Sequence, residues 1–327
     1  MSQLSRRNLV IAGAGAAAAF GLNRPIAFIG PASAQFAPGA IKPFHSFKAG
    51  AIEVTTIYDG LWEKPHDANF AKNASIDDVK KALAAGGQTD AYVPIPFTVT
   101  VVKINGHTIM FDAGTGGQAV PPGLGKAGLM AETNMRAAGI DPATINTIVV
   151  THFHPDHIFG LMARDTNAQI YPNAEIIMPA SEYKFWTDES VFTKLPAPAH
   201  GLPKRIQATF PGWKNVKRFE GDVEVAPGIR AVASNGHTPG HTSYFVTAGT
   251  EQVWVTGDIT NIPALNMKNP GMYLGFDSDP VVAEASRRRI FERAIAEKAV
   301  LTGYHWGMPG AGTIAKDGNG YTFVPVA

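Results

Sequence analysis

Four side chains that can bind metals fall within six consecutive positions of one short segment. The segment is THFHPDHIFG (Thr151–Gly160), and the four are His152, His154, Asp156 and His157. Imidazoles and carboxylates are costly to bury without partners, yet the segment follows the apolar run INTIVV (Ile145–Val150), which predicts a buried strand. We expect Pro155 to prevent a helix here, so that the loop directs the first two histidines to one point and the other pair to a neighbouring point. This spacing predicts that one loop contributes to two metal sites.

Two metal ions need more than four ligands, and three further candidates lie at the ends of other predicted strands. They are His237 in NGHTPGH after the strand Ile229–Ala233, Asp258 in VTGD after Gln252–Thr256, and His305 in LTGYHWG after Ala299–Thr302. Each has a nearby glycine that lets the backbone bend sharply, and rigid scaffolds place reactive groups at strand ends. Taken alone, each is more often a structural histidine or a turn aspartate. Taken together and in this order, they predict a metal site.

The ordered motifs H-x-H-x-D-H, G-H-T-P-G-H, G-D and a late G-x-H resemble those of the metallo-β-lactamase superfamily. The resemblance extends from about Ile52 to Val326 and includes FDAGTG at Phe111–Gly116. It implies an α/β fold, a four-layer αβ/βα sandwich, with a binuclear metal site. By motif it assigns His152, His154 and His237 to the first metal, Asp156, His157 and His305 to the second, and Asp258 to both. It also implies supporting positions for Asp112, near the metals, and for His241, for which a core histidine bonded to the backbone is the alternative.

Within the superfamily, the chain is most similar to exported dinuclear hydrolases of the methyl parathion hydrolase and dihydrocoumarin-type lactonase group. The motifs that carry this likeness occur in the expected order: THFHPDHIFGLM, YPNAEI, EYKFW, HTPGHTSY, DSDP and GNGYTFVPV. The sequence has no cysteine, which excludes disulfides and also excludes lactamases that use a thiolate at the second metal. The likeness implies a dinuclear hydrolase and suggests a homodimer.

The expected chemistry follows from two divalent ions held about 3.5–4 Å apart, which can share a water molecule and lower its pKa towards neutrality. We expect a bridging hydroxide to attack a carbonyl carbon or phosphorus, while one ion stabilises the oxyanion and the other takes the departing phenolate or alkoxide. In this mechanism Asp258 fixes the separation of the ions and Asp156 orients the nucleophile. Zinc is the default ion for such histidine-rich ligands, and manganese, iron or cobalt are also accepted.

Aromatic and apolar residues near the ligands could wall a hydrophobic substrate pocket. The candidates are Phe153, Phe159, Phe185, Trp186, Leu265 and Phe276, although such residues are often part of a core. Asn261, three residues after Asp258, is polar where an organophosphate hydrolase is expected to present an apolar wall. We therefore rank hydrolysis of a lactone or aryl ester above hydrolysis of an organophosphate triester.

Three other functions fit the sequence less well. A glyoxalase II-like thioesterase would need a basic cluster for the glutathione carboxylates, and lysine and arginine are only scattered. A redox member would need iron and usually an appended flavin domain, which we do not expect because the chain ends about 20 residues after His305. A non-catalytic periplasmic metal-binding protein is the third alternative, and the intact ligand set argues against it.

The elements that must position these residues alternate between strands and helices in two blocks, which favours one compact domain of two sheets with outer helices. Further strands are predicted at Ile52–Tyr58, Phe97–Ile104, Thr108–Phe111, Glu175–Met178, Val216–Phe219 and Ser243–Thr247. Helices are predicted at Ile76–Ala85 with Ser75 as N-cap, at Ala131–Ala138 and at Val281–Glu297. On the last helix, we expect Arg287, Arg288 and Arg289 to form a solvated face.

The first 34 residues have the features of a twin-arginine export signal. Arg6 and Arg7 precede an Ala/Gly-rich apolar run at Leu9–Leu22, and Ala32-Ser33-Ala34 offers a signal peptidase site. An ordinary Sec signal or a retained N-terminal helix is the alternative. We predict a signal peptide at residues 1–34, a single hydrolase domain at residues 35–327 that begins with an extended leader at Gln35–Lys48, and a periplasmic location.

The charge balance narrows the class of partner. Residues 1–34 carry three of the 28 basic side chains and none of the 27 acidic ones, which leaves 25 basic against 27 acidic groups in the mature chain. That near-neutral balance does not predict a basic surface that would bind nucleic acid. No segment approaches the roughly 20 consecutive apolar residues that a membrane-spanning helix needs. We expect a small hydrophobic ester, lactone or phosphotriester as the partner, with no nucleic acid and no stable membrane anchor.

Overall fold

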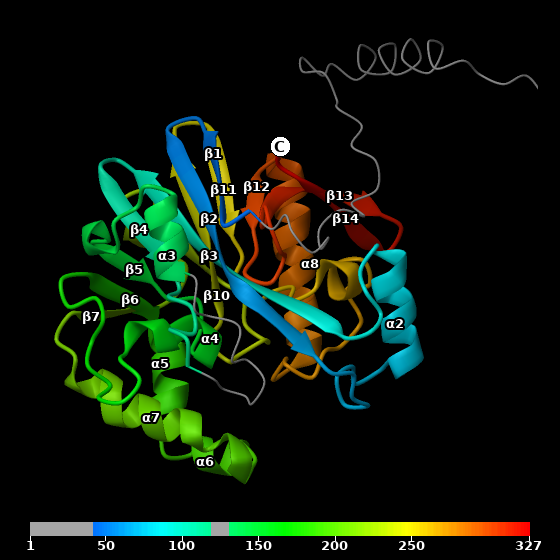
Figure 1. Ribbon diagram of the computed structural model, residues 1–327, viewed down its shortest axis with the longest axis horizontal. Coiled ribbons are helices and arrows are strands. Elements are labelled where there is room, and N and C mark those ends of the chain that lie inside the picture. The colour runs from blue at the N-terminus through cyan, green and yellow to red at the C-terminus, as the bar shows by residue number, and fades with distance from the viewer. Residues whose placement is uncertain (1–41, 119–130) are drawn as a thin grey trace, which may run out of the picture.

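The computed structural model describes residues 42–118 and 131–327, which form two seven-stranded β-sheets with helices outside them (Figure 1). The signal peptide expected at residues 1–34 lies outside the described residues. In the two described ranges, no helix is both long enough and apolar enough to cross a membrane.

The first sheet runs in chain order from β1 to β7. Its strands are β1 (Phe44–Ala49), β2 (Ile52–Lys64), β3 (Val93–Ile104), β4 (His107–Phe111), β5 (Thr147–Val149), β6 (Glu175–Pro179) and β7 (Val216–Phe219). The first four strands pair antiparallel, and the pairs from β4 to β7 are parallel. The predicted hairpin between β3 and β4 is confirmed: Asn105 and Gly106 both have positive φ, as a tight two-residue turn requires.

The second sheet has the order β14-β13-β12-β11-β10-β9-β8. Its strands are β8 (Glu224–Ala226), β9 (Ile229–Ala233), β10 (Thr242–Ala248), β11 (Glu251–Val255), β12 (Val300–Thr302), β13 (Ala311–Asp317) and β14 (Gly320–Pro325). Its strands pair antiparallel except β11 and β12, which are parallel. A parallel pair needs a long crossover, and helix α8 lies in that connection.

The described α-helices number seven, two of which begin at a side-chain N-cap. They are α2 (Ile76–Ala85), α3 (Ala131–Ala137), α4 (Pro155–Ile158), α5 (Ala180–Thr187), α6 (Val191–Lys194), α7 (Gly201–Thr209) and α8 (Pro280–Glu297). Ser75 and Asp78 form a reciprocal capping box at the start of α2. The Asp279 carboxylate accepts from two backbone N–H groups at the start of α8, where Pro280 occupies the first helical position.

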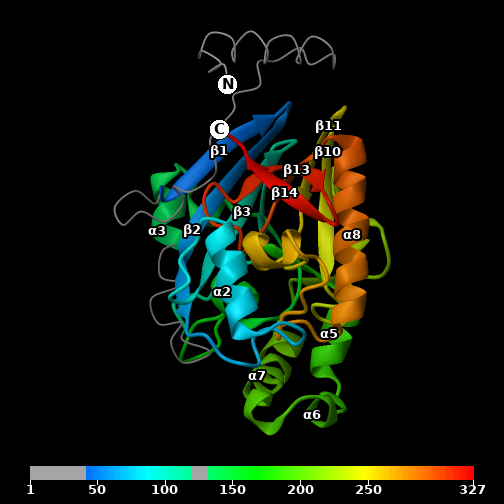
Figure 2. The ribbon, with the colours of Figure 1, turned by 90° about the vertical axis from the view of Figure 1, so that its right-hand side faces the viewer.

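The structure is a four-layer sandwich in which α8 lies outside the second sheet (Figure 2). Three clusters of buried hydrophobic side chains hold its layers together. Side chains such as Phe111 and Tyr244 fill the space between the two sheets. Phe291 of α8 packs with Trp254 on the outer face of the second sheet, and α3 covers the outer face of the first sheet near β2. The αβ/βα sandwich expected from the sequence motifs is confirmed.

Three sequence expectations differ from the structure. β1 begins at Phe44, inside the segment expected to be a leader, because Phe44–Ala49 pairs along β2. Pro155 does not prevent a helix but begins the one-turn helix α4, since proline is tolerated where the N–H has no helical partner. Arg287 is not solvated: its side chain is fully buried, whereas Arg288 is partly exposed and Arg289 is exposed.

Candidate metal centre

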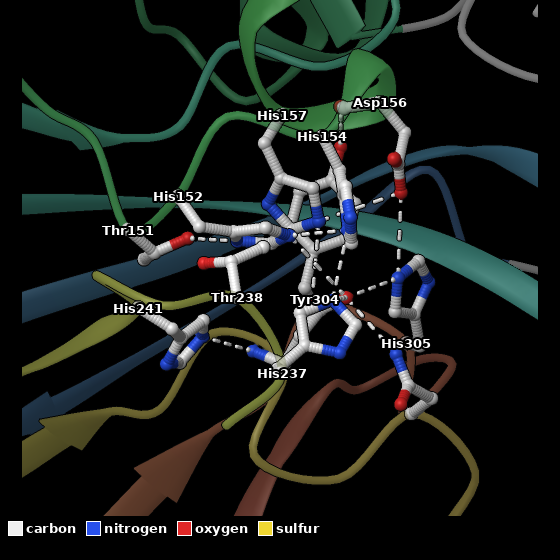
Figure 3. A network of polar contacts seen from close by, with 12 residues as sticks. Thr151, His152, His154, Asp156, His157, His237, Thr238, His241, Tyr304 and His305 are labelled. Carbon is white, nitrogen blue, oxygen red and sulfur yellow. Dashed lines mark hydrogen bonds and ion pairs between the residues drawn. The ribbon is translucent and has the colours of Figure 1, made fainter. Parts of the chain in front are cut away.

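The seven candidate ligands meet at one end of the two facing sheets (Figure 3). His152 and its neighbours follow β5 of the first sheet. His237, Asp258 and His305 follow β9, β11 and β12 of the second sheet. The site is therefore assembled from both sheets, at the carboxyl ends of strands that are themselves buried and rigid.

One group of ligand atoms is formed by three histidines. The His154 Nδ1 atom lies 3.0 Å from His152 Nε2 and 2.9 Å from His237 Nε2. His152 and His237 are almost completely buried, and His154 is partly exposed. Figure 3 shows the three rings pointing towards one another, an arrangement that offers three nitrogens to one ion.

A second group lies beside the first and combines two histidines with a carboxylate. Asp156 Oδ2 is 3.4 Å from the Nε2 atoms of both His157 and His305. Asp258 stands between the groups: its Oδ2 is 3.3 Å from His237 Nε2, and its Oδ1 is 3.3 Å from His157 Nε2. Its Oδ2 is also 3.0 Å from His305 Nε2. A carboxylate in this position can reach ions in both groups.

The unsatisfied atoms of the site fit bound cations. The buried atoms His157 Nε2 and Asp258 Oδ1 have no hydrogen-bond partner, and such orphaned groups are costly unless something binds them. Ring nitrogens that face one another at about 3 Å cannot all satisfy their lone pairs among themselves. Nitrogen and oxygen donors without a thiolate are a ligand set typical of zinc and similar divalent ions.

Asp112 holds His157 in the orientation that a ligand needs. One Asp112 oxygen accepts the Thr151 N–H at 2.8 Å, and the other accepts the Thr151 hydroxyl at 2.8 Å and lies 2.7 Å from His157 Nδ1. That contact places the ring proton on Nδ1 and leaves Nε2 free to bind a cation. Asp112 itself has a positive φ, 60°, at the end of β4, so its supporting position depends on a backbone conformation that is uncommon for non-glycine residues.

His241 supports Asp258 through the backbone. Its Nε2 accepts the Asp258 N–H at 3.0 Å, and its Nδ1 lies 2.8 Å from the Ser234 hydroxyl. Because the backbone N–H can only donate, His241 carries its proton on Nδ1. Burial together with the neighbouring His237 lowers the pKa of His241 to about 3, so the ring is neutral. The structure thus places His241 next to a candidate ligand without making it one.

Two supporting contacts escaped the sequence reasoning. Asp277 Oδ1 lies 3.0 Å from His237 Nδ1, and its other oxygen is 3.4 Å from the buried guanidinium of Arg287. The Pro96 carbonyl accepts from His305 Nδ1 at 2.8 Å. Asp277 lies in the DSDP motif, but the motif alone does not indicate which of its carboxylates turns inward, and backbone carbonyls carry no sequence signal.

The carboxylates determine how the histidines titrate. Burial disfavours a charged ring, but Asp258 and Asp277 outweigh it and raise the pKa of His237 to about 9. His305, beside Asp258 and Asp156, likewise has its pKa raised to about 9 against the effect of burial. By contrast, burial and the neighbouring His237 lower the pKa of His154 to about 3. The metal-free site therefore holds protons at the positions where cations would bind.

A cavity of about 420 Å³ opens onto these ligands. Its described walls are mainly apolar, and Trp62, Ile95, Phe97 and Phe276 contribute to them together with Asn261. No lysine or arginine is among the described residues that line it. Of the expected pocket residues Phe159, Trp186, Asn261 and Phe276, the last two are among the residues that line it.

The other two expected pocket residues point elsewhere. Phe159 is buried in the core of the first sheet, with the Arg205 guanidinium 4.3 Å from its ring centre. Trp186 is also buried, donates its indole N–H to Glu182 at 2.7 Å and packs near the His154 ring. Neither is among the cavity-lining residues in the described part of the chain. Both predictions failed because local spacing does not reveal which side of a helix faces the cavity.

Comparison with known proteins identifies the family. Residues 95–301, more than half of the chain, match the family model described as the metallo-beta-lactamase superfamily. The chain belongs to the metallo-β-lactamase superfamily.

Curated relatives within the metallo-β-lactamase superfamily include lactonases. An N-acyl homoserine lactonase of Bacillus sp. is 29% identical over 168 residues, which are 51% of this chain and 58% of that protein. The lactonase AttM of Agrobacterium fabrum is 26% identical over 179 residues, which are 49% of this chain and 62% of that protein. The chain thus spans less than two thirds of the length of these relatives.

A solved structure confirms the metallo-β-lactamase fold over almost the whole described chain. AidC, described as a dizinc quorum-quenching lactonase in complex with a product, N-hexnoyl-L-homoserine, has a TM-score of 0.78 at 23% identity. The likeness covers 88% of this chain and 98% of AidC.

Proposed function

We propose that this protein is a dinuclear metal-dependent hydrolase that opens neutral lactones carrying an apolar substituent. The observation that carries the proposal is the convergence of seven ligand side chains at an apolar cavity. The lactonases among its relatives support the choice of a lactone, as does the likeness of its motifs to the methyl parathion hydrolase and dihydrocoumarin-type lactonase group.

In this proposal the two groups of ligands hold one divalent ion each. His152, His154 and His237 would hold the first, Asp156, His157 and His305 would hold the second, and Asp258 would serve both. Zinc suits these donors, and manganese, iron or cobalt are the other candidates. When bound, the ions supply Lewis acidity and a water molecule whose pKa is lowered towards neutrality.

The chain's own residues then fix the reacting groups. Asp258 is held from two sides, because its N–H donates to His241 and its Oδ2 accepts from the Asn261 amide at 3.0 Å. Asp156 is held at its backbone carbonyl, which accepts the Tyr304 hydroxyl at 2.6 Å. We assign Asp156 the orientation of the attacking water, since its carboxylate lines the cavity and can accept a proton from it.

The cavity walls favour an uncharged, apolar substrate. Trp62, Phe97 and Phe276 contribute aromatic rings to the described lining, and Trp62 and Phe276 contact each other with ring centres 6.4 Å apart. Without a lysine or arginine among the described lining residues, a substrate carboxylate remote from the metal centre would have no basic side chain to pair with, which disfavours a glutathione thioester. A lactone with a hydrocarbon acyl chain meets both conditions.

Aryl esters are the second candidate class, because Trp62, Phe97 and Phe276 form an aromatic wall that can also contact an aryl group. Organophosphate triesters with an aryl group could contact the same aromatic wall, but their phosphoryl group would lie beside the polar Asn261. For that reason we rank them below lactones and aryl esters.

A substrate panel with the zinc-loaded protein tests the proposal. The comparison is of kcat/KM for acyl-homoserine lactones, dihydrocoumarin, phenyl acetate, a paraoxon-type triester and a thioester. We expect the lactones to give the highest values, and we expect chelation or His152→Ala to abolish turnover. A matched variant, His107→Ala, changes an exposed histidine on β4 far from the ligands and should keep full activity. A higher kcat/KM for the thioester or the triester than for every lactone would overturn the proposal.

We also propose export to the periplasm by the twin-arginine route, as the Arg6-Arg7 pair suggests. Replacing both arginines by lysine should stop export, and normal periplasmic accumulation of that double variant would contradict the route. The homodimer stays a prediction from family likeness.

A further inference from the structure

A buried carboxylate outside the ligand set joins the two segments that carry the three-histidine group. Glu182, in the first turn of α5, is fully buried. Its Oε1 accepts the Phe153 N–H at 2.9 Å and the Trp186 indole N–H at 2.7 Å. Its Oε2 accepts the Thr238 hydroxyl at 2.8 Å and the Gly240 N–H at 2.9 Å. Four donors thus converge on one carboxylate, which is the pattern of a strongly held anion.

The positions of the donors connect this carboxylate to the metal centre. Phe153 lies between His152 and His154, and Thr238 directly follows His237. One oxygen of Glu182 therefore holds the segment after β5, and the other holds the segment after β9. Gly240 allows this close approach, because any side chain there would collide with the Glu182 backbone.

We infer that Glu182 is a positioning residue that holds His152, His154 and His237 in the geometry needed to bind one metal ion. The inference rests on the metal-binding role in the proposed function and is independent of the substrate. Glu182 contacts backbone N–H groups, the Thr238 hydroxyl and the Trp186 indole, and it touches no reacting atom. The Trp186 indole, also on α5, donates to the same Glu182 carboxylate. This hydrogen bond accounts for the burial of Trp186 beside His154, which a role in the substrate pocket would not.

The inference predicts a selective effect, since the other metal-binding group is held by different contacts. Asp112 orients His157, the Pro96 carbonyl orients His305, and Tyr304 holds the Asp156 backbone. None of these contacts involves Glu182. Loss of the Glu182 carboxylate should therefore weaken the three-histidine site and spare its neighbour.

Glu182→Gln is the appropriate change because it keeps the side-chain volume. Three of the four donors are N–H groups, which cannot reverse their direction. An amide has only one oxygen, so its NH₂ group must face either the Phe153 and Trp186 N–H groups or the Gly240 N–H. Either choice leaves buried donors facing each other and pushes one ligand-bearing segment away from α5.

The test measures zinc affinity of the full chain in two backgrounds, by competition with a chelator and without substrate. His305→Ala leaves the three-histidine site intact, and His154→Ala leaves the neighbouring site. We expect Glu182→Gln to weaken zinc binding by about 10- to 100-fold in the first background and by less than about twofold in the second. Equal losses in both backgrounds, or no loss in the first, would overturn the inference.

Two further variants keep the test decisive. Glu297→Gln alters a carboxylate that also accepts an indole N–H, from Trp254 at 3.2 Å, but lies on α8 away from the ligands; it should leave both zinc affinities unchanged. If Glu182→Gln does not fold, Trp186→Phe removes one donor and keeps a ring, and the same criterion applies to it. A chain whose two backgrounds both fail to bind zinc would refute the proposed metal centre itself.

Discussion

At the scale of single residues, burial and neighbouring carboxylates determine which imidazoles carry protons. His154 and His241 have pKa values of about 3 and are neutral, whereas His237 and His305 have pKa values of about 9. Each of the latter two belongs to a different ligand group. Protons and metal ions therefore compete for the same ring nitrogens in both halves of the centre.

This competition predicts how metal affinity depends on pH. Below about pH 9, His237 and His305 are protonated in the metal-free protein, and each must release a proton before its Nε2 can bind an ion. The apparent zinc affinity of the three-histidine site should rise by about tenfold per pH unit from pH 6 to 9 and level off above pH 9. That of the other site should rise more steeply, because Asp258, Asp156 and Asp112 outweigh burial and also raise the pKa of His157. Zinc titrations at a series of pH values measure this, and an affinity that is flat between pH 6 and 9 would contradict the assignment.

At the scale of elements, α8 supports the metal centre although it carries no ligand. Its buried Arg287 donates to the Pro270 carbonyl at 2.6 Å and lies 3.4 Å from Asp277, which in turn orients His237. A buried guanidinium is tolerated when its donors are paired. Helix α8 thus holds the segment that precedes it, and Asp277 in that segment orients the candidate ligand His237.

Asp277→Asn tests this connection. The amide presents one acceptor and one donor where both His237 and Arg287 need an acceptor, so the His237 ring loses its fixed orientation. We expect zinc affinity to fall by about 10- to 100-fold, measured by chelator competition. Asp279→Asn is the matched control, because Asn and Asp cap helices about equally well. The same zinc affinity in Asp277→Asn and wild type would show that α8 has no part in metal binding.

At the scale of the whole molecule, the metal centre connects the two sheets. The ligands from His152 to His157 come from the first sheet, and His237, Asp258 and His305 come from the second. Each group of candidate ligands therefore combines residues from both sheets. An ion that binds only the folded chain stabilises it by about 2.7 kcal/mol at a concentration of 100 Kd.

Metal removal should consequently lower the melting temperature. At about 2–4 °C per kcal/mol for a domain of this order of size, each ion at that concentration should contribute roughly 5–10 °C. Thermal unfolding with excess zinc and with a chelator measures the difference, and readdition of zinc serves as the control. Equal melting temperatures in both conditions would mean that the sheets are not connected through bound metal.

The sequence by itself determined the type of those elements that have strong local signals, together with the ordered set of candidate ligands. The β3–β4 hairpin, helix α2 with its Ser75 cap and helix α8 with its Asp279 cap follow from local signals that short-range geometry decides. The ligand motifs could be found because each lies directly after a strand, so its place at the sheet end follows from its place in the chain. These features depend on neighbours only a few residues away.

Tertiary structure decided which side chains meet. Arg287 is buried because the Asp277 segment and the Pro270 carbonyl surround it. Phe159 packs in the core of the first sheet, with the Arg205 guanidinium over its ring. Asp277 is 40 residues from the histidine that it orients, and Glu182 joins segments 29 and 58 residues away. Hydrogen bonds and burial between residues so distant in the chain depend on how the two sheets pack, which no local pattern of residues encodes.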